Sequence, residues 1–146
     1  MPSVQDILSH KGREVASVER ERTVIDAARE MNRLRIGSLV VVDGPKVVGM
    51  FTERDILVRV VAEARDPNRI TVGQVMTTPV VCVGLETDLA ECKSIVTSRR
   101  IRHIPVVDRG QLVGIVTSGD IMARESREHE VTIESLVEYI GGPPPV

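Results

Sequence analysis

The stretch IGSLVVVDGPKVVGMFTERDI, residues 36–56, occurs a second time as IRHIPVVDRGQLVGIVTSGDI, residues 101–121. With an offset of 65 and no gap, nine of the 21 aligned residues are identical. Both copies end in the pattern Gly-x-x-Thr-x-x-Asp-Ile. An internal repeat of this kind predicts a fold built from two similar units.

The residues around the first copy predict the order strand, helix, strand, strand, helix. A short strand at 15–18 precedes a helix that begins at Thr23, which has the side chain of a good N-cap. Strands at 39–42 and 47–51 then lead directly into a helix at Thr52. Aliphatic runs without alternation are typical of strands that are covered on both faces.

The second copy follows the same order. It predicts a strand at 80–83 and a helix after Asp88, and the helical turn at 72–76 corresponds to the one at 4–8. The offset between copies is 68 before the first strand and 65 after it. The first copy therefore carries three extra residues, around Lys11-Gly12-Arg13, in a single loop.

We predict an α/β (α+β) fold with two β-α-β-β-α repeats related by a pseudo-two-fold axis. The first repeat would span residues 4–66 and the second 67–127, and residues 128–146 would form a C-terminal helix and tail. A unit of this size covers its own sheet poorly. The two repeats should therefore pack on each other as one module.

Composition excludes several classes of function. The net charge is −2, and Phe51 and Tyr139 are the only aromatic residues, so nucleic acid is not expected as the main ligand. The three histidines are too scattered for a metal site. Without a cationic leader or a long apolar run, we expect a soluble cytoplasmic protein with no membrane partner.

The repeated motif has two physical interpretations. In one, its Thr caps a helix and its Asp favours the helix dipole, for about 1 kcal/mol of stability. In the other, the Gly leaves room for a ligand, the helix N-terminus attracts phosphate, and the carboxylate accepts hydrogen bonds from two ribose hydroxyls. The residues concerned are Gly49, Thr52, Asp55, Gly114, Thr117 and Asp120.

The repeated unit, which closes with GMFTERDI and GIVTSGDI, resembles the cystathionine-beta-synthase (CBS) domain. Two such units in tandem resemble a CBS pair, also called a Bateman module. The segments VQDIL, IRHIPVVD, TERDI and VEYIGG extend the resemblance to small stand-alone CBS-pair proteins over nearly the whole chain. The resemblance implies a module that binds adenosine-containing ligands in two clefts between the repeats.

The resemblance also implies roles for individual residues. The implied residues are Asp55 and Asp120 for ribose, Thr52, Thr117, Arg54, Arg102 and His103 for phosphate, and Val15, Val80, Ile36 and Ile101 for the adenine pocket. The clefts should differ, because the first motif has Arg54 where the second has Gly119. Arg99 and Arg100 are interpreted mainly as a solvated helix end, with a phosphate role left open.

The leading hypothesis is a non-catalytic sensor with AMP as its regulatory ligand, and with ADP, ATP or NAD as alternatives. No cofactor is required, and we expect a homodimer that acts on an unknown protein effector. A ligand-independent oligomerisation module is the alternative. Catalysis is disfavoured because the sequence places no nucleophile, metal cluster or histidine pair next to either motif carboxylate.

Overall fold

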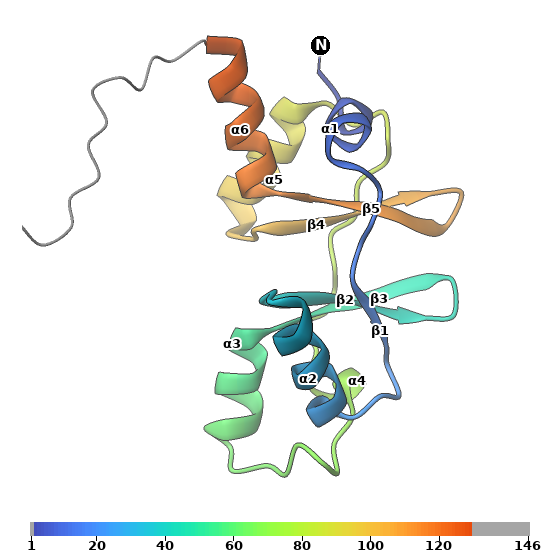
Figure 1. Ribbon diagram of the computed structural model, residues 1–146, viewed down its shortest axis with the longest axis vertical. Helices are drawn as coiled ribbons and strands as arrows, with labels where there is room; N and C mark the ends of the chain where they lie inside the picture. The colour runs from blue at the N-terminus through green and yellow to red at the C-terminus, as the bar shows by residue number, and fades with distance from the viewer. Residues whose placement is uncertain (1, 130–146) are drawn as a thin grey trace, which may run out of the picture.

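The computed structural model describes residues 2–129, which form two halves stacked one on the other (Figure 1). The first half contains β1 (Ser17–Glu19), α2 (Val24–Leu34), β2 (Ser38–Asp43), β3 (Lys46–Thr52) and α3 (Glu53–Asp55), which continues as the π-helical segment η1 (Ile56–Val61). The second half contains α5 (Leu89–Arg99), β4 (His103–Asp108), β5 (Gln111–Thr117) and α6 (Ser118–His129). The predicted C-terminal helix, with its amphipathic segment at 131–140, lies outside the described residues.

The two strand pairs share one register, as the repeat predicts. Ser38 pairs with Thr52 in the antiparallel pair β2–β3, and His103 pairs with Thr117 in β4–β5. Each pair has a register shift at the corresponding place, between Val41 and Val42 and again 65 residues later. Each motif therefore begins at the same point, where the second strand of a pair runs into a helix.

The prediction of a strand at 80–83 is wrong. In the first half, β1 runs parallel to β2, and the Val40 N–H donates to the Ala16 carbonyl at 3.1 Å. The residue that corresponds to Val40 is Pro105, which has no N–H to donate. Only an isolated bridge between Val83 and Val106 remains, so β4 and β5 form a two-stranded sheet.

The halves exchange their leading helices. The helix α1 (Val4–Lys11) comes first in the chain but packs into the core of the second half, beside Leu89, Cys92 and Ile104. The short helix α4 (Val72–Val75) packs into the core of the first half. Each sequence repeat therefore supplies its first helix to the other half, which ties the halves together.

The motif glycines lie where these exchanged segments pack. A Cβ atom at Gly49 would lie 2.6 Å from Met76 Sδ and 2.9 Å from the Thr77 carbonyl oxygen. A Cβ atom at Gly114 would lie 2.8 Å from Leu8 Cδ1. The glycine of each motif thus permits close packing of protein on the strand, and not only the approach of a ligand.

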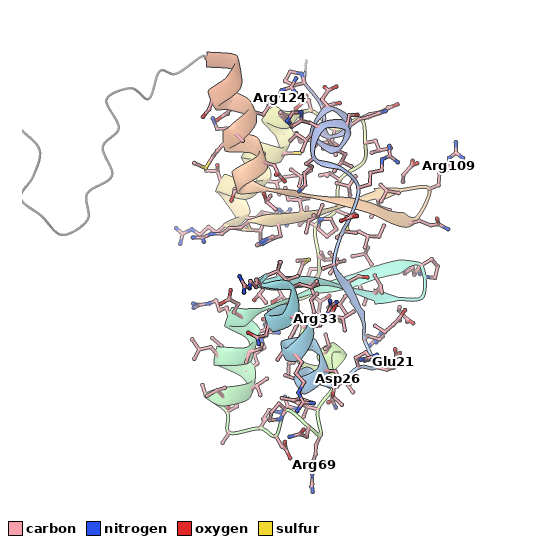
Figure 2. The ribbon with its side chains drawn as sticks, in the orientation of Figure 1. Glu21, Asp26, Arg33, Arg69, Arg109 and Arg124 are labelled. Carbon is pink, nitrogen blue, oxygen red and sulfur yellow. The ribbon has the colours of Figure 1, made fainter. Side chains whose placement is uncertain are left out.

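A further apolar cluster joins the facing sheets. It contains buried Val40, Val42 and Met50, packed against side chains that include Val80 and Ile115. Charges of both signs are spread over the outside of the molecule, as Glu21, Asp26, Arg69 and Arg109 illustrate in Figure 2. Within residues 2–129, no helix is long and apolar enough to cross a membrane.

Candidate functional site

Both motifs form the capping box that their residue types allow. At the first, the Thr52 N–H donates to Asp55 Oδ2 at 3.0 Å, and the Asp55 N–H donates to Thr52 Oγ1 at 3.3 Å. At the second, the Thr117 N–H donates to Asp120 Oδ2 at 2.8 Å, and the Asp120 N–H donates to Thr117 Oγ1 at 3.1 Å. Helix capping is thus part of what each motif does.

Asp55 is buried, with 5% of its surface exposed, and it connects the first motif to the segment after α4. The Thr77 hydroxyl donates to Asp55 Oδ1 at 2.8 Å, and Arg59 Nε lies 4.0 Å from the same oxygen. Arg59 also donates to the carbonyls of Val75, at 3.2 Å, and Met76, at 2.6 Å. Among these groups, Thr77 lines the cavity described below.

Asp120 has a different partner. The Lys11 ammonium donates to Asp120 Oδ2 at 2.7 Å and to the Ile115 carbonyl at 3.0 Å. The Lys11 side chain is 29% exposed and the Asp120 side chain 22%. The carboxylate of the second motif is therefore held by a cation from the far end of the sequence.

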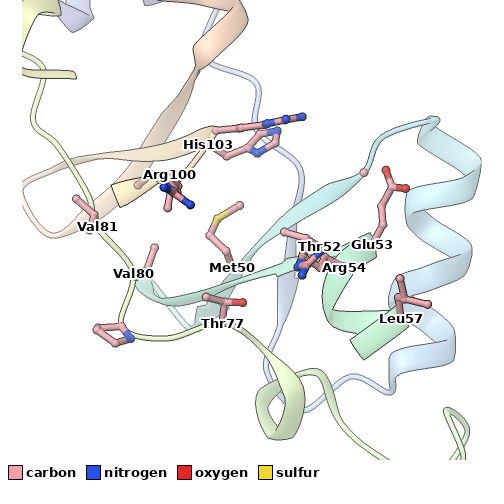
Figure 3. A pocket seen from close by; sticks show the side chains of 14 residues that line it. Met50, Thr52, Glu53, Arg54, Leu57, Thr77, Val80, Val81, Arg100 and His103 are labelled. Carbon is pink, nitrogen blue, oxygen red and sulfur yellow. The ribbon is translucent and has the colours of Figure 1, made fainter. Parts of the chain in front are cut away.

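A cavity of about 680 Å³ lies between the halves, beside the first motif (Figure 3). Its walls come from the first half, from the segment after α4, and from the turn between α5 and β4. The lining residues are Gly37, Met50, Thr52, Glu53, Arg54, Leu57, Thr77, Pro79, Val80, Val81, Arg100, Ile101, Arg102 and His103. Its volume lies within the range of small-molecule pockets, roughly 300–1,000 Å³.

The polar part of the lining is mainly basic. Arg54 comes from the first motif, whereas Arg100 and Arg102 come from the turn before β4, and Glu53 is the acidic residue in the lining. A Cβ atom at Gly37 would overlap the Glu53 carboxylate, so glycine lets this side chain lie against the start of β2. The excess of positive charge suits an anionic ligand.

The structure brings together six of the predicted site residues in this cavity: Thr52, Arg54, Val80, Ile101, Arg102 and His103. Asp55 is not in the lining and lies behind Thr52 and Thr77. Val15, Ile36, Thr117 and Asp120 are not in the lining either. Thr117 and Asp120 belong to the second motif. At the offset of 65, Val15 and Ile36 correspond to Val80 and Ile101, which do line the cavity.

Sequence reasoning missed three polar residues of the cavity, Glu53, Thr77 and Arg100. Arg100, interpreted mainly as part of a solvated helix end, lines the cavity and has φ of 54° as the C-cap of α5. The left-handed conformation ends the helix there, and the chain turns at once into the lining residues that follow. Thr77 carried no signal, because its contact with Asp55 depends on the exchanged position of α4.

His103 is half-buried in the lining, and burial lowers the pKa of its imidazole below the usual value of 6.5. The positive charges of Arg102 and Lys11 lower this pKa further, while Asp120 raises it. The histidine is therefore neutral near pH 7 in the free protein. A neutral imidazole can donate a hydrogen bond and can become a cation beside a bound anion.

The lowered pKa of His103 predicts a loss of stability in acid. As the pH falls below 6.5, His103 becomes protonated in the unfolded chain but stays neutral in the folded protein. The free energy of unfolding therefore decreases as the pH decreases, until the pH reaches the pKa of folded His103. Urea unfolding at about pH 7.5 and about pH 5.5 measures this slope. The His103→Gln variant should have a smaller slope, whereas equal slopes in both proteins would contradict this assignment.

Within the described part of the chain, no group of three or more His, Cys, Asp or Glu side chains could hold a metal ion.

Comparison with known proteins gives a clear family. The family model of the CBS domain matches residues 4–62 and 72–127. The CBS domain-containing protein YhcV of Bacillus subtilis (strain 168) is 34% identical over 125 residues, which cover 86% of this chain and 86% of YhcV.

Solved structures of CBS-domain proteins resemble this chain as well. A candidate signal-transduction protein with CBS domains from Burkholderia ambifaria MC40-6 is 34% identical with a TM-score of 0.81, covering 90% of this chain and 99% of that one. A hexameric CBS-CP12 protein from bloom-forming cyanobacteria is 26% identical with a TM-score of 0.74, covering 90% and 76%. The chain therefore belongs to the CBS domain family, as a CBS pair of the signal-transduction and regulatory class.

Proposed function

We propose that this CBS pair is a non-catalytic sensor that binds an adenine nucleotide, with AMP as the leading ligand, in the cavity beside the first motif. The observation that carries the proposal is that residues of both halves line a single cavity. Arginines, threonine hydroxyls and aliphatic side chains meet there in a volume that suits a mononucleotide. The arginines would contact the phosphate, the threonine hydroxyls the sugar and phosphate, and the aliphatic side chains the base.

The adenine would lie between the aliphatic side chains of Val80 and Ile101, since the cavity lining has no Phe, Tyr or Trp on which a base could stack. The phosphate would be held by Arg54 and Arg102, with the Thr52 hydroxyl beside them. Arginine provides planar, charge-assisted hydrogen bonds to phosphate oxygens. A phosphate beside His103 would also favour its protonated form.

The ribose would face Thr77, with Asp55 directly behind it. The Thr77 hydroxyl now donates to Asp55 Oδ1 at 2.8 Å. If this hydroxyl rotates toward the ligand, the carboxylate oxygen becomes free to accept a hydrogen bond from a sugar hydroxyl. We therefore retain Asp55 as the ribose ligand of the proposed site, with Thr77 as the group that gives access to it.

A ligand in this cavity would contact both halves and would favour the arrangement in which its contacts are complete. It can shift the packing of the halves only by the difference in its affinity for the two arrangements. This difference is the signal that a protein effector would detect.

Thermal and urea unfolding with adenosine, AMP, ADP, ATP and NAD test the proposal. A true ligand at about 100 times its dissociation constant should raise the free energy of unfolding by about 2.7 kcal/mol. We expect the phosphorylated ligands to act at lower concentration than adenosine, because the arginines contact phosphate. No shift with any of these compounds would contradict the proposal.

We further propose that the chain forms a homodimer through the exposed apolar side chains of η1 and α6. The ribbons of these two helices lie on the same side of the molecule in Figure 1. The residues are Leu57, 58% exposed, Val58, 44%, Val61, 64%, and Met122, 65%. Water-exposed side chains of this size favour burial against a second copy. Ligand-independent assembly, the alternative function, would use the same surface.

The dimer proposal predicts that Val61→Glu and Met122→Glu each give a monomer at concentrations where the wild type is a dimer. A glutamate at the centre of an apolar interface is buried without a partner, at a cost of several kcal/mol. Leu34→Glu, on α2 and 39% exposed, is the matched control and should leave the dimer intact. Light scattering after size exclusion measures the mass, and dimeric Val61→Glu and Met122→Glu variants would contradict the assignment.

A further inference from the structure

The two motif sites differ in their positive charge. At the offset of 65, the cavity residues Arg54, Arg100, Arg102 and His103 correspond to Gly119, Arg35, Gly37 and Ser38. The second site thus keeps one arginine, Arg35, and has Gly119 in place of Arg54. A phosphate group would find fewer partners there than in the cavity.

The two motif carboxylates also differ in the groups that donate hydrogen bonds to them. In the first half, Thr77 donates from its N–H to the Met50 carbonyl at 2.7 Å and from its hydroxyl to Asp55 at 2.8 Å. In the second half, Ile115 and Asp120 occupy the corresponding positions, and the Lys11 ammonium donates to both. A single ammonium group therefore replaces the two neutral donors of Thr77.

The three extra residues of the first repeat explain how Lys11 reaches this place. Whereas α4 ends at Val75, α1 continues to Lys11 at the corresponding end of the other half. Gly12 then stops the helix, with φ of 98° and an N–H that donates to the Leu8 carbonyl at 2.8 Å. Lys11 is thus held at the last turn of a helix whose apolar face is fixed in the core.

We propose that Lys11 occupies the second motif site as an internal cation and limits the chain to one nucleotide, bound beside the first motif. This inference rests on the proposed function of the cavity. A sugar hydroxyl at Asp120 would have to displace an ammonium at 2.7 Å, where the Coulomb attraction of an ion pair adds to the hydrogen bond, and a neutral hydroxyl lacks that attraction. At Asp55 Oδ1, the ligand competes with the Thr77 hydroxyl at 2.8 Å, while the Arg59 guanidinium lies at 4.0 Å, beyond hydrogen-bonding distance.

Isothermal titration calorimetry with AMP tests the inference by stoichiometry. The wild type should bind one AMP per chain. Lys11→Ala should bind two, the second more weakly because the site lacks the counterpart of Arg54. Lys11→Ser, which leaves a hydroxyl as Thr77 does, should also bind two and serves as a second variant if Lys11→Ala does not fold. Lys93→Ala removes the ion pair between Lys93 and Glu125, 2.8 Å long, and should still bind one.

The outcomes separate the two proposals. Two AMP molecules per wild-type chain, or one in a folded Lys11 variant, would contradict the role of Lys11 and leave the proposed function standing. No AMP bound by the wild type or by the variants would overturn the proposed function, and the inference about Lys11 with it. A second molecule gained only in the Lys11 variants supports both.

Discussion

The double variant Arg54→Ala/Arg102→Ala is expected to bind AMP roughly 10²–10⁴-fold more weakly than the wild type. Both arginines line the cavity, Arg54 from α3 of the first half and Arg102 from the turn before β4 of the second half. A hydrogen bond to a charged group contributes about 1.5–3 kcal/mol, so removing two costs about 3–6 kcal/mol. Since about 1.4 kcal/mol is a factor of ten, titration calorimetry should resolve the loss readily.

The matched control is Arg69→Ala/Arg109→Ala, because both side chains are exposed and point away from the molecule (Figure 2). This control changes the net charge by two units, as the double variant does, without touching the cavity, and its AMP affinity should equal that of the wild type. An equal loss in both proteins would mean that AMP responds to overall charge. Unchanged affinity in the double variant would exclude the two arginines as phosphate ligands.

Replacing Phe51 by Ala is expected to lower the free energy of unfolding by about 3–5 kcal/mol, as for other large aromatic side chains in protein cores. Phe51 is fully buried in the core of the first half, and its volume is the largest among the fully buried side chains of the described residues. It pairs across the sheet with Leu39 and immediately precedes Thr52. Urea unfolding measures the loss.

Leu34→Ala serves as the control for this prediction, because Leu34 is 39% exposed and lies outside the proposed dimer surface, so the loss should be about 1 kcal/mol or less. Phe51→Leu should fall between the two, since it retains much of the buried volume. If Phe51→Ala unfolds at the same urea concentration as the wild type, the core of the first half does not depend on its one aromatic ring.

The repeat made the order of the main elements predictable. Strands at the two copies, the helices capped by Thr23 and Asp88, and the start of a helix at each motif all follow from local residue patterns. The missing strand at 80–83 was also visible in principle, because Pro105 stands where Val40 donates its N–H. The exchange of α1 and α4 could not be predicted, since both helices have similar apolar faces and either half could accept either helix.

The site was predictable where it depends on position within the repeat, and not where it depends on packing between halves. Thr52, Arg54 and Arg102 were found from the motif and its flanking residues, and they line the cavity. The partners of the carboxylates were not found, because Thr77 and Lys11 arrive from exchanged segments. The repeat suggested two equivalent acids, whereas in the structure the nearest exchanged partner of Asp55 is a hydroxyl at 2.8 Å, with Arg59 at 4.0 Å, and that of Asp120 is an ammonium at 2.7 Å.

A crystal structure of the wild-type protein saturated with AMP tests the proposed site most directly. We expect AMP beside the first motif, with the base between Val80 and Ile101 and the phosphate within hydrogen-bonding distance, about 2.7–3.2 Å, of Arg54 and Arg102. AMP bound elsewhere, with this cavity empty, would contradict the proposed site.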